Sequence, residues 1–143
     1  MIDRVGAESR SGVYIQPAVL RVVVVEDSRI IRERLADLLR DIPNLATVAY
    51  AATQDEALAI LRQGQWEVVI LDLQLKEGTG IRVLEELAKI TRREDTTVIV
   101  FSNFDFPQYR SKTIALGADF FFDKSLEFRR LHEVLAGLAG KMH

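Results

Sequence analysis

The 143-residue sequence contains no cysteine and only two histidines, His132 and His143. The absence of cysteine excludes disulfides, thiolate catalysis and cysteine-ligated zinc, and two histidines are too few for a typical zinc site. Any metal bound by this chain would therefore be held by oxygen ligands.

Charge of one sign and long apolar runs are also missing. Lys and Arg total 19 against 21 Asp and Glu, a formal net charge of −2, so no basic excess would attract nucleic acid or an anionic membrane. No apolar run reaches membrane-spanning length, and the opening segment "MIDRVGAESRSGVYIQPAV" lacks the pattern of a signal peptide. We therefore expect a cytoplasmic protein with no nucleic-acid partner and no membrane insertion.

The remaining pattern is an alternation of apolar, β-branched runs with segments of helical period. Such alternation indicates βαβ units around a parallel sheet, and a content of 48% hydrophobic and 28% charged residues suits one globular domain. We expect an α/β fold with five strands and five helices. The predicted strands are 20–25, 44–50, 66–75, 96–103 and 119–124, and the predicted helices are 28–40, 53–64, 79–90, 105–117 and about 125–138.

Several helix boundaries carry local signals. Ser28 is a candidate N-cap, Thr53 and Glu56 have the spacing of a capping box, and Gly64 is a candidate helix stop. Asp105 can cap the fourth helix, which has Pro107 in its first turn. Residues 1–17 read as a flexible polar tail before a single domain, 18–143, with no output domain after it.

Polar side chains lie at the carboxyl ends of four of the five predicted strands. The first strand ends in Glu26 and Asp27, the third in Asp72, the fourth in Ser102 and the fifth in Lys124. In open parallel sheets the carboxyl ends of the strands form the ligand site, so we expect these side chains to converge. Taken singly, each has an ordinary explanation as a cap, a turn or a surface charge.

The acidic part of this set requires a compensating cation. Two carboxylates about 4 Å apart repel by about 4 kcal/mol at an effective dielectric constant near 20. A hard divalent ion such as Mg²⁺, with Mn²⁺ as the other candidate, binds one or two carboxylates together with water and phosphate oxygens. With Lys124 and the Ser102 hydroxyl added, the set is typical of a phosphoryl-transfer site, in which Asp72 is left to accept the phosphoryl group.

The series Glu26-Asp27, Asp72, Ser102 and Lys124, in this order and at these strand ends, resembles the receiver domain of two-component response regulators over about residues 20–140. The resemblance implies a flavodoxin-like sheet of strand order 2-1-3-4-5 in a stand-alone receiver. It also implies Mg²⁺ binding and transfer of a phosphoryl group from a histidine kinase or phosphotransfer protein to Asp72.

The resemblance further implies a role for each residue. Asp72 would be phosphoacceptor and metal ligand, Asp27 a direct ligand, Glu26 a ligand through water, and Gln74 a ligand through its backbone carbonyl. Lys124 and Ser102 would contact the phosphoryl oxygens, and Ser102 with Phe121 would form the switch. The output partner, or a second copy in a homodimer, would contact the face of the fourth helix, fifth strand and fifth helix, where the aromatic candidates are Phe104, Phe106 and Tyr109.

Three positions depart from the family pattern. Ser125 and Lys76 stand where proline is usual, and Asn103 stands where a small residue is usual. None of the three removes a group that phosphorylation requires. Ser125 puts in doubt the cis peptide common at that loop, because a non-proline cis bond costs about 3 kcal/mol.

Two other functions remain open. An aspartate-nucleophile phosphohydrolase would need an acid two residues after the nucleophile, and Gln74 occupies that position. An adaptor that uses the receiver fold without phosphorylation is the other alternative. In the favoured interpretation the chain is not an enzyme. The only reactions that it would catalyse are its own phosphorylation from small donors and its own dephosphorylation.

Overall fold

The computed structural model describes residues 7–8, 14–15, 18–90, 95–103 and 106–142. One sheet contains five parallel strands, β3 (Leu20–Val25), β4 (Leu45–Ala51), β5 (Val68–Leu71), β6 (Thr97–Ser102) and β7 (Phe120–Asp123). The strands lie in the order β4-β3-β5-β6-β7, which confirms the predicted order 2-1-3-4-5 and the α/β fold class.

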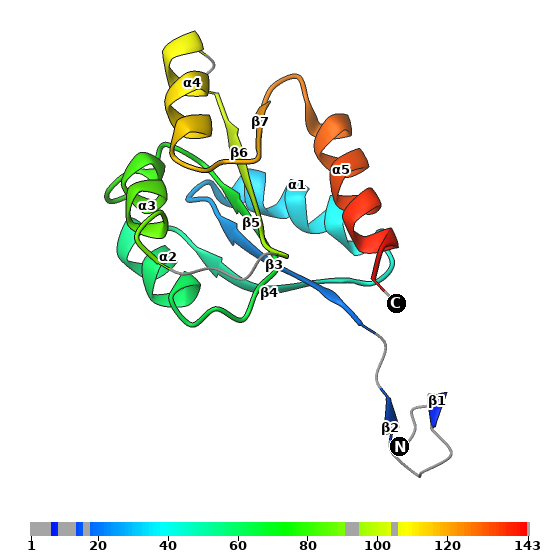
Figure 1. The fold of residues 1–143 in the computed structure, drawn as a ribbon. Helices are drawn as coiled ribbons and strands as arrows, with labels where there is room; N and C mark the ends of the chain where they lie inside the picture. Colours follow the sequence, from blue (N-terminus) through cyan, green and yellow to red (C-terminus); the bar gives the residue numbers. More distant parts are fainter. Residues whose placement is uncertain (1–6, 9–13, 16–17, 91–94, 104–105, 143) are drawn as a thin grey trace.

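The sheet strands alternate with helices that cover both faces of the sheet. Figure 1 shows α1 and α5 on one face and α2 and α3 on the other. The helices are α1 (Arg29–Arg40), α2 (Gln54–Leu61), α3 (Gly80–Leu87), α4 (Pro107–Ala115) and α5 (Phe128–Gly140). Within the described ranges, no helix combines the length and the apolar character needed to cross a membrane.

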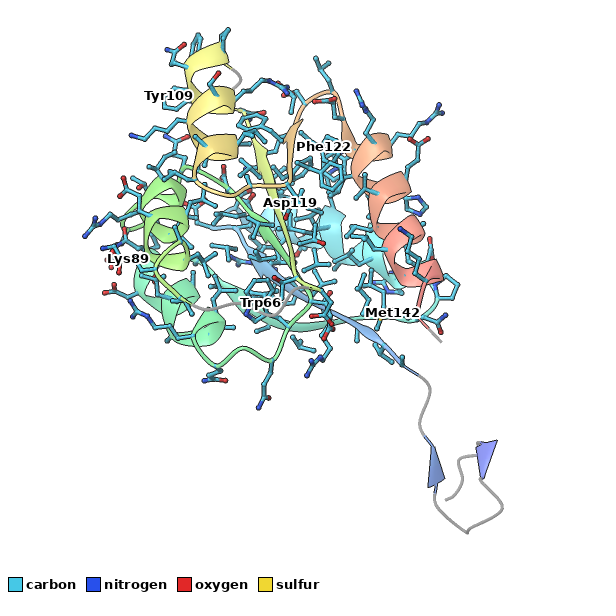
Figure 2. All side chains as sticks on the ribbon, in the orientation of Figure 1. Trp66, Lys89, Tyr109, Asp119, Phe122 and Met142 are labelled. Carbon is cyan, nitrogen blue, oxygen red and sulfur yellow. The ribbon has the colours of Figure 1, made fainter. Side chains whose placement is uncertain are left out.

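The four consecutive valines of β3 are explained by burial on both faces of the sheet. Val22 and Val24 pack in a cluster with α1 and α5, whereas Val23 and Val25 pack in a cluster with α2 and α3, and each is at most 1% exposed. Neighbouring side chains of a strand point to opposite faces, so a strand covered on both sides is apolar throughout. Figure 2 shows the same two-sided filling, with Phe122 between β7 and α5.

Two predicted helix caps have different outcomes. Ser28 is confirmed as the N-cap of α1, since its Oγ accepts a hydrogen bond from the N–H of Ile31 at 3.3 Å. Thr53 caps α2 by accepting from the N–H of Glu56 at 3.2 Å, but the reciprocal bond of a capping box is absent from this pair. The Glu56 carboxylate instead accepts from the N–H of Ala52 at 2.8 Å, one residue earlier than the motif requires.

The predicted starts of the last two helices are wrong. The N-cap of α4 is Phe106, which makes no side-chain cap bond, and Asp105 lies outside the described residues. Helix α5 begins at Phe128 and not near Ser125, because the carboxylate of Asp123 accepts from the N–H groups of Ser125 and Leu126 at 2.7 and 3.1 Å. These bonds hold a turn between β7 and α5.

The strand β5 ends earlier than predicted, whereas the predicted helix stop after α2 is confirmed. The apolar run 66–75 predicts a longer strand than β5, which ends at Leu71 because the Asp72 side chain binds the backbone N–H two residues later. Gly64 follows α2 with a φ of +73°, in the left-handed region that favours glycine after a helix, as predicted.

Part of the predicted tail is paired. Strand β1 (Ala7–Glu8) lies antiparallel to β2 (Tyr14–Ile15), with Ala7 opposite Ile15 and Glu8 opposite Tyr14. The sequence pattern did not predict this ladder. The rest of the tail, 1–6, 9–13 and 16–17, lies outside the described residues.

A half-buried ion pair holds the amino-terminal ends of β3 and β5 together. The Arg21 guanidinium donates to Glu67 through Nη2 at 2.6 Å and Nε at 3.1 Å, and the Arg21 backbone N–H donates to Glu67 Oε1 at 2.6 Å. The side chain of Glu67 is only 6% exposed, whereas that of Arg21 is 35% exposed. Water therefore screens one partner of this pair.

Glu67→Gln is expected to lower the free energy of unfolding by about 2 kcal/mol, less than the roughly 3–5 kcal/mol of a fully buried pair, because Arg21 can be partly rehydrated. The amide oxygen of the variant can still accept from the Arg21 backbone N–H, so the loss of stability reports on the removed negative charge of Glu67. Urea denaturation measures the free energy of unfolding. Glu33→Gln, in the exposed pair with Arg29 at 3.2 Å, is the control and should change little. Equal effects of the two substitutions would contradict this role of Glu67.

Candidate functional site

Three carboxylates meet at the carboxyl ends of β3 and β5. Glu26 and Asp27 directly follow β3, and the N–H of Asp72 donates to the carbonyl of Val25 at 3.0 Å, which places Asp72 beside them. One oxygen from each carboxylate lies within 4.8 Å of the others. Glu26 and Asp72 are buried, while Asp27 is the most exposed of the three.

Lys124 joins two of these carboxylates from the end of β7. Its Nζ lies 2.7 Å from Glu26 Oε1 and 2.8 Å from Asp72 Oδ2. The three side chains are 9%, 2% and 5% exposed respectively, so little water screens their charges. The convergence predicted for these residues is therefore observed in the structure.

The second oxygens of Glu26 and Asp72 bind the backbone. Glu26 Oε2 accepts from the N–H of Ser28 at 3.0 Å, and Asp72 Oδ1 accepts from the N–H of Gln74 at 3.3 Å. Both oxygens of Glu26 and both oxygens of Asp72 therefore have a hydrogen-bond or ion-pair partner. Gln74 itself is exposed at the rim of the site.

Burial and pairing shift the pKa values of Glu26 and Lys124. Burial raises the pKa of the Glu26 carboxyl, and this effect outweighs the opposing hydrogen bonds from Lys124 and Ser28. For Lys124, burial alone would lower the pKa, but the hydrogen bonds and charges of Asp72 and Glu26 prevail and raise it. The ammonium of Lys124 is therefore strongly retained while both carboxylates face it.

Two residues that the sequence reasoning missed shape the loops of the site. A side chain at Gly80, the first residue of α3, would collide with the backbone of Asp72 and Leu73, so glycine permits this close approach. Asp123 holds the turn after Lys124 through the two bonds described above. The signal for Gly80 was its place beside the helix cap Thr79, whereas the role of Asp123 depends on the folded turn.

The predicted switch residues lie on the neighbouring strands. Ser102 ends β6, is 1% exposed, and its carbonyl accepts from the N–H of Lys124 at 3.2 Å. Phe121 in β7 is 7% exposed and packs in the cluster beneath α2 and α3. The Arg110 guanidinium lies over the Phe121 ring at 4.6 Å and reaches Glu127 Oε1 at 3.4 Å, so this arginine connects α4, β7 and the start of α5.

The aromatic residues of the predicted partner face are only partly described. Phe106 is 59% exposed, and its ring centroid lies 6.2 Å from that of Tyr109 in a tilted arrangement. Tyr109 is half-buried and packs against the cluster beneath α2 and α3 from α4, beside which it is labelled in Figure 2. Phe104 lies outside the described residues.

The three departures from the expected pattern are accommodated. Every peptide bond among the described residues is trans, so the bond between Lys124 and Ser125 is trans. Ser125 Oγ donates to Asn103 Oδ1 at 3.0 Å, which brings two of the departures into contact. Lys76 is exposed and binds the backbone of Ala52 through its N–H at 3.3 Å.

The donor set fits a hard divalent cation. The carboxylates of Glu26, Asp27 and Asp72 and the ammonium of Lys124 together carry a formal excess of two negative charges. Carboxylate oxygens are the ligands that Mg²⁺ and Mn²⁺ prefer in proteins. Asp27 is the most accessible carboxylate for an incoming ion.

Comparison with known proteins agrees with the family resemblance of the sequence. The family model of the response regulator receiver domain matches residues 22–136. A protein-glutamate methylesterase/protein-glutamine glutaminase 1 of Methanospirillum hungatei is 30% identical over 123 residues, which cover 86% of this chain and 36% of that protein. The DNA-binding transcriptional activator DevR/DosR of Mycobacterium tuberculosis is 27% identical over 108 residues, 76% of this chain and 49% of that protein.

Solved structures agree with the sequence comparison. The response regulator domain of Thermotoga maritima CheB is 27% identical, with a TM-score of 0.71, and the match covers 85% of this chain and 95% of that domain. The receiver domain of the putative response regulator NarL from Mycobacterium tuberculosis, 22% identical with a TM-score of 0.76, shares the fold. The chain spans between 25% and 36% of the length of the methylesterase relatives.

Proposed function

We propose that this chain, which belongs to the receiver domains of two-component response regulators, accepts a phosphoryl group on Asp72. The observation that carries the proposal is the contact of Lys124 Nζ with Glu26 and Asp72, at 2.7 and 2.8 Å, beside the accessible Asp27. A nucleophilic carboxylate, a buried ammonium and a place for a divalent ion are the parts that phosphoryl transfer requires.

In the proposed reaction a carboxylate oxygen of Asp72 attacks phosphorus, and an acyl phosphate forms as the bond to the donor breaks. With a phosphohistidine donor, the leaving group is the imidazole of a kinase or phosphotransfer protein. Lys124 neutralises phosphoryl oxygens, and Ser102 donates its hydroxyl to one of them. Asp27 and Asp72 would hold Mg²⁺ directly, with Glu26 acting through water and Gln74 through its carbonyl. The ion would supply positive charge to the transferring group.

The chain acts in this proposal as a signalling phosphoprotein in the cytoplasm and not as an enzyme with a separate substrate. Its only catalysis would be its own phosphorylation from small donors and its own dephosphorylation. Gln74 supports this assignment over a phosphohydrolase, because an amide two residues after the nucleophile cannot serve as general acid or base.

Incubation with Mg²⁺ and acetyl phosphate, followed by intact mass over time, tests the phosphoacceptor role. We expect a gain of one phosphoryl group that a chelator prevents. Fast consumption of acetyl phosphate without an accumulated adduct would favour the phosphohydrolase. A chain that neither gains mass nor consumes the donor, also in the presence of a histidine kinase, would favour the unphosphorylated adaptor.

We propose that α4, β7 and α5 form the output face. Arg110 connects these three elements through Phe121 and Glu127, and the exposed Phe106 beside Tyr109 offers an aromatic contact. A shift of the Ser102 loop on phosphorylation would change the packing of α4, and with it the affinity for a target protein or a second copy. Light scattering on the phosphorylated sample examines dimer formation, and an unchanged mass together with unchanged target affinity would reject this face.

A further inference from the structure

A side-chain hydrogen bond joins the two loops that flank the candidate site. Ser125 Oγ donates to Asn103 Oδ1 at 3.0 Å, between residues that lie 22 positions apart in the chain. Asn103 directly follows Ser102 at the end of β6, and Ser125 directly follows Lys124 after β7. We call this contact the Asn103–Ser125 bridge.

The bridge adds to a backbone connection in the same place. Ser102 pairs with Asp123 in the register of β6 and β7, and the Lys124 N–H donates to the Ser102 carbonyl at 3.2 Å. The sheet ends there, and beyond it the bridge holds the next residue of one loop against the next residue of the other. Two successive contacts therefore join the backbone segments that carry Ser102 and Lys124, the two residues proposed to contact the phosphoryl oxygens.

The bridge lies on the solvent side of these groups. Ser102 is 1% and Lys124 8% exposed, whereas Asn103 and Ser125 are both exposed. Lys124 in turn contacts Asp72. Separation of the two loops would thus open a path from solvent towards the buried residues around Asp72.

We propose that the Asn103–Ser125 bridge prolongs the lifetime of the phosphoryl group on Asp72, with Asn103 and Ser125 as positioning residues that keep the two loops together. This inference rests on the proposed function. Hydrolysis requires a water oxygen to attack phosphorus while the bond from phosphorus to the Asp72 oxygen breaks. This reaction releases inorganic phosphate and a proton and restores the carboxylate. Closed loops limit the approach of that water and keep Ser102 and Lys124 in place.

Four variants isolate the hydrogen bond. Ser125→Ala and Asn103→Ala each remove one partner, and the double variant removes both, while Ser125→Thr keeps the hydroxyl. One net hydrogen bond corresponds to about a two- to tenfold effect, so we expect the adduct of either alanine variant to decay faster by that factor. The double variant should match the single variants, because all three break the same bond, and Ser125→Thr should decay like the wild type.

Hydrogen exchange on the metal-free, unphosphorylated chain provides an independent readout. A peptide containing Ser102 and Asn103 should exchange faster in Ser125→Ala than in the wild type or Ser125→Thr. Equal decay in all variants would overturn the effect on lifetime, and additive effects of the two alanine substitutions would overturn the shared bond. If the wild type gains no phosphoryl group, the proposed function fails, and the exchange experiment alone decides whether the bridge holds the loops.

Discussion

Asp72→Asn is expected to gain no phosphoryl group under the conditions in which the wild-type chain gains one. The amide keeps the size of the side chain and an oxygen that can accept from the Gln74 N–H, which lies 3.3 Å from Asp72 Oδ1 in the wild type. It lacks the anionic oxygen that attacks phosphorus, so the covalent step is lost while the surrounding backbone is retained. Intact mass over time measures the difference.

A matched substitution separates the phosphoacceptor from a metal ligand. Asp27→Asn removes an accessible carboxylate from the same cluster but leaves Asp72 and its contact with Lys124 in place. We expect this variant to form the adduct slowly and to require more Mg²⁺, since the ion loses one ligand. Asp72→Asn, in contrast, should form none at any Mg²⁺ concentration.

The modified residue can also be located directly. Borohydride reduces an aspartyl phosphate to homoserine, and fragmentation of the tryptic peptides then identifies the residue. The proposal requires homoserine at position 72. Modification of Asp27 or Glu26, or an undiminished mass gain in Asp72→Asn, would contradict it.

The parts of this fold that could be predicted from the sequence are those set by local patterns. The β-branched runs Val22–Val25 in β3 and Val98–Val100 in β6 indicate strands, because their side chains are buried alternately on the two faces of the sheet. Ser28 caps α1 because its hydroxyl reaches the N–H three residues later. The convergence of Glu26, Asp72 and Lys124 followed from the same reasoning, since parallel strands end at one edge of the sheet.

The parts that could not be predicted depend on side chains that meet only in the folded loops. Asp123 binds the backbone of Ser125 and Leu126 and so delays the start of α5, although the helical pattern begins earlier in the sequence. Glu56 prefers the N–H of Ala52 to that of the cap Thr53, a choice between neighbouring donors that spacing cannot decide. The Asn103–Ser125 bridge likewise joins two departures from the family pattern that are unrelated by position in the sequence.

Lys124→Met is expected to destabilise the metal-free chain strongly, and by more than Glu67→Gln does. The side chain of Lys124 is 9% exposed, and its removal leaves the Glu26 and Asp72 carboxylates buried without their cation. Breaking a buried ion pair from one side costs about 3–5 kcal/mol, mainly because the remaining charge is unpaired. Urea denaturation in the presence of a chelator should show a loss of this size, whereas Lys112→Met, at an exposed position of α4, should show little change.

Addition of Mg²⁺ should show whether the loss of stability in Lys124→Met comes from the missing positive charge or from lost packing. If the ion binds at Asp27 and Asp72, it replaces part of the missing positive charge, so it should bind the variant more tightly than the wild type and stabilise it more. A ligand present at 100 times its dissociation constant stabilises a fold by about 2.7 kcal/mol, enough to restore much of the loss. A Lys124→Met chain that remained equally unstable with saturating Mg²⁺ would indicate that Lys124 contributes through packing and that the carboxylates do not share a metal ion.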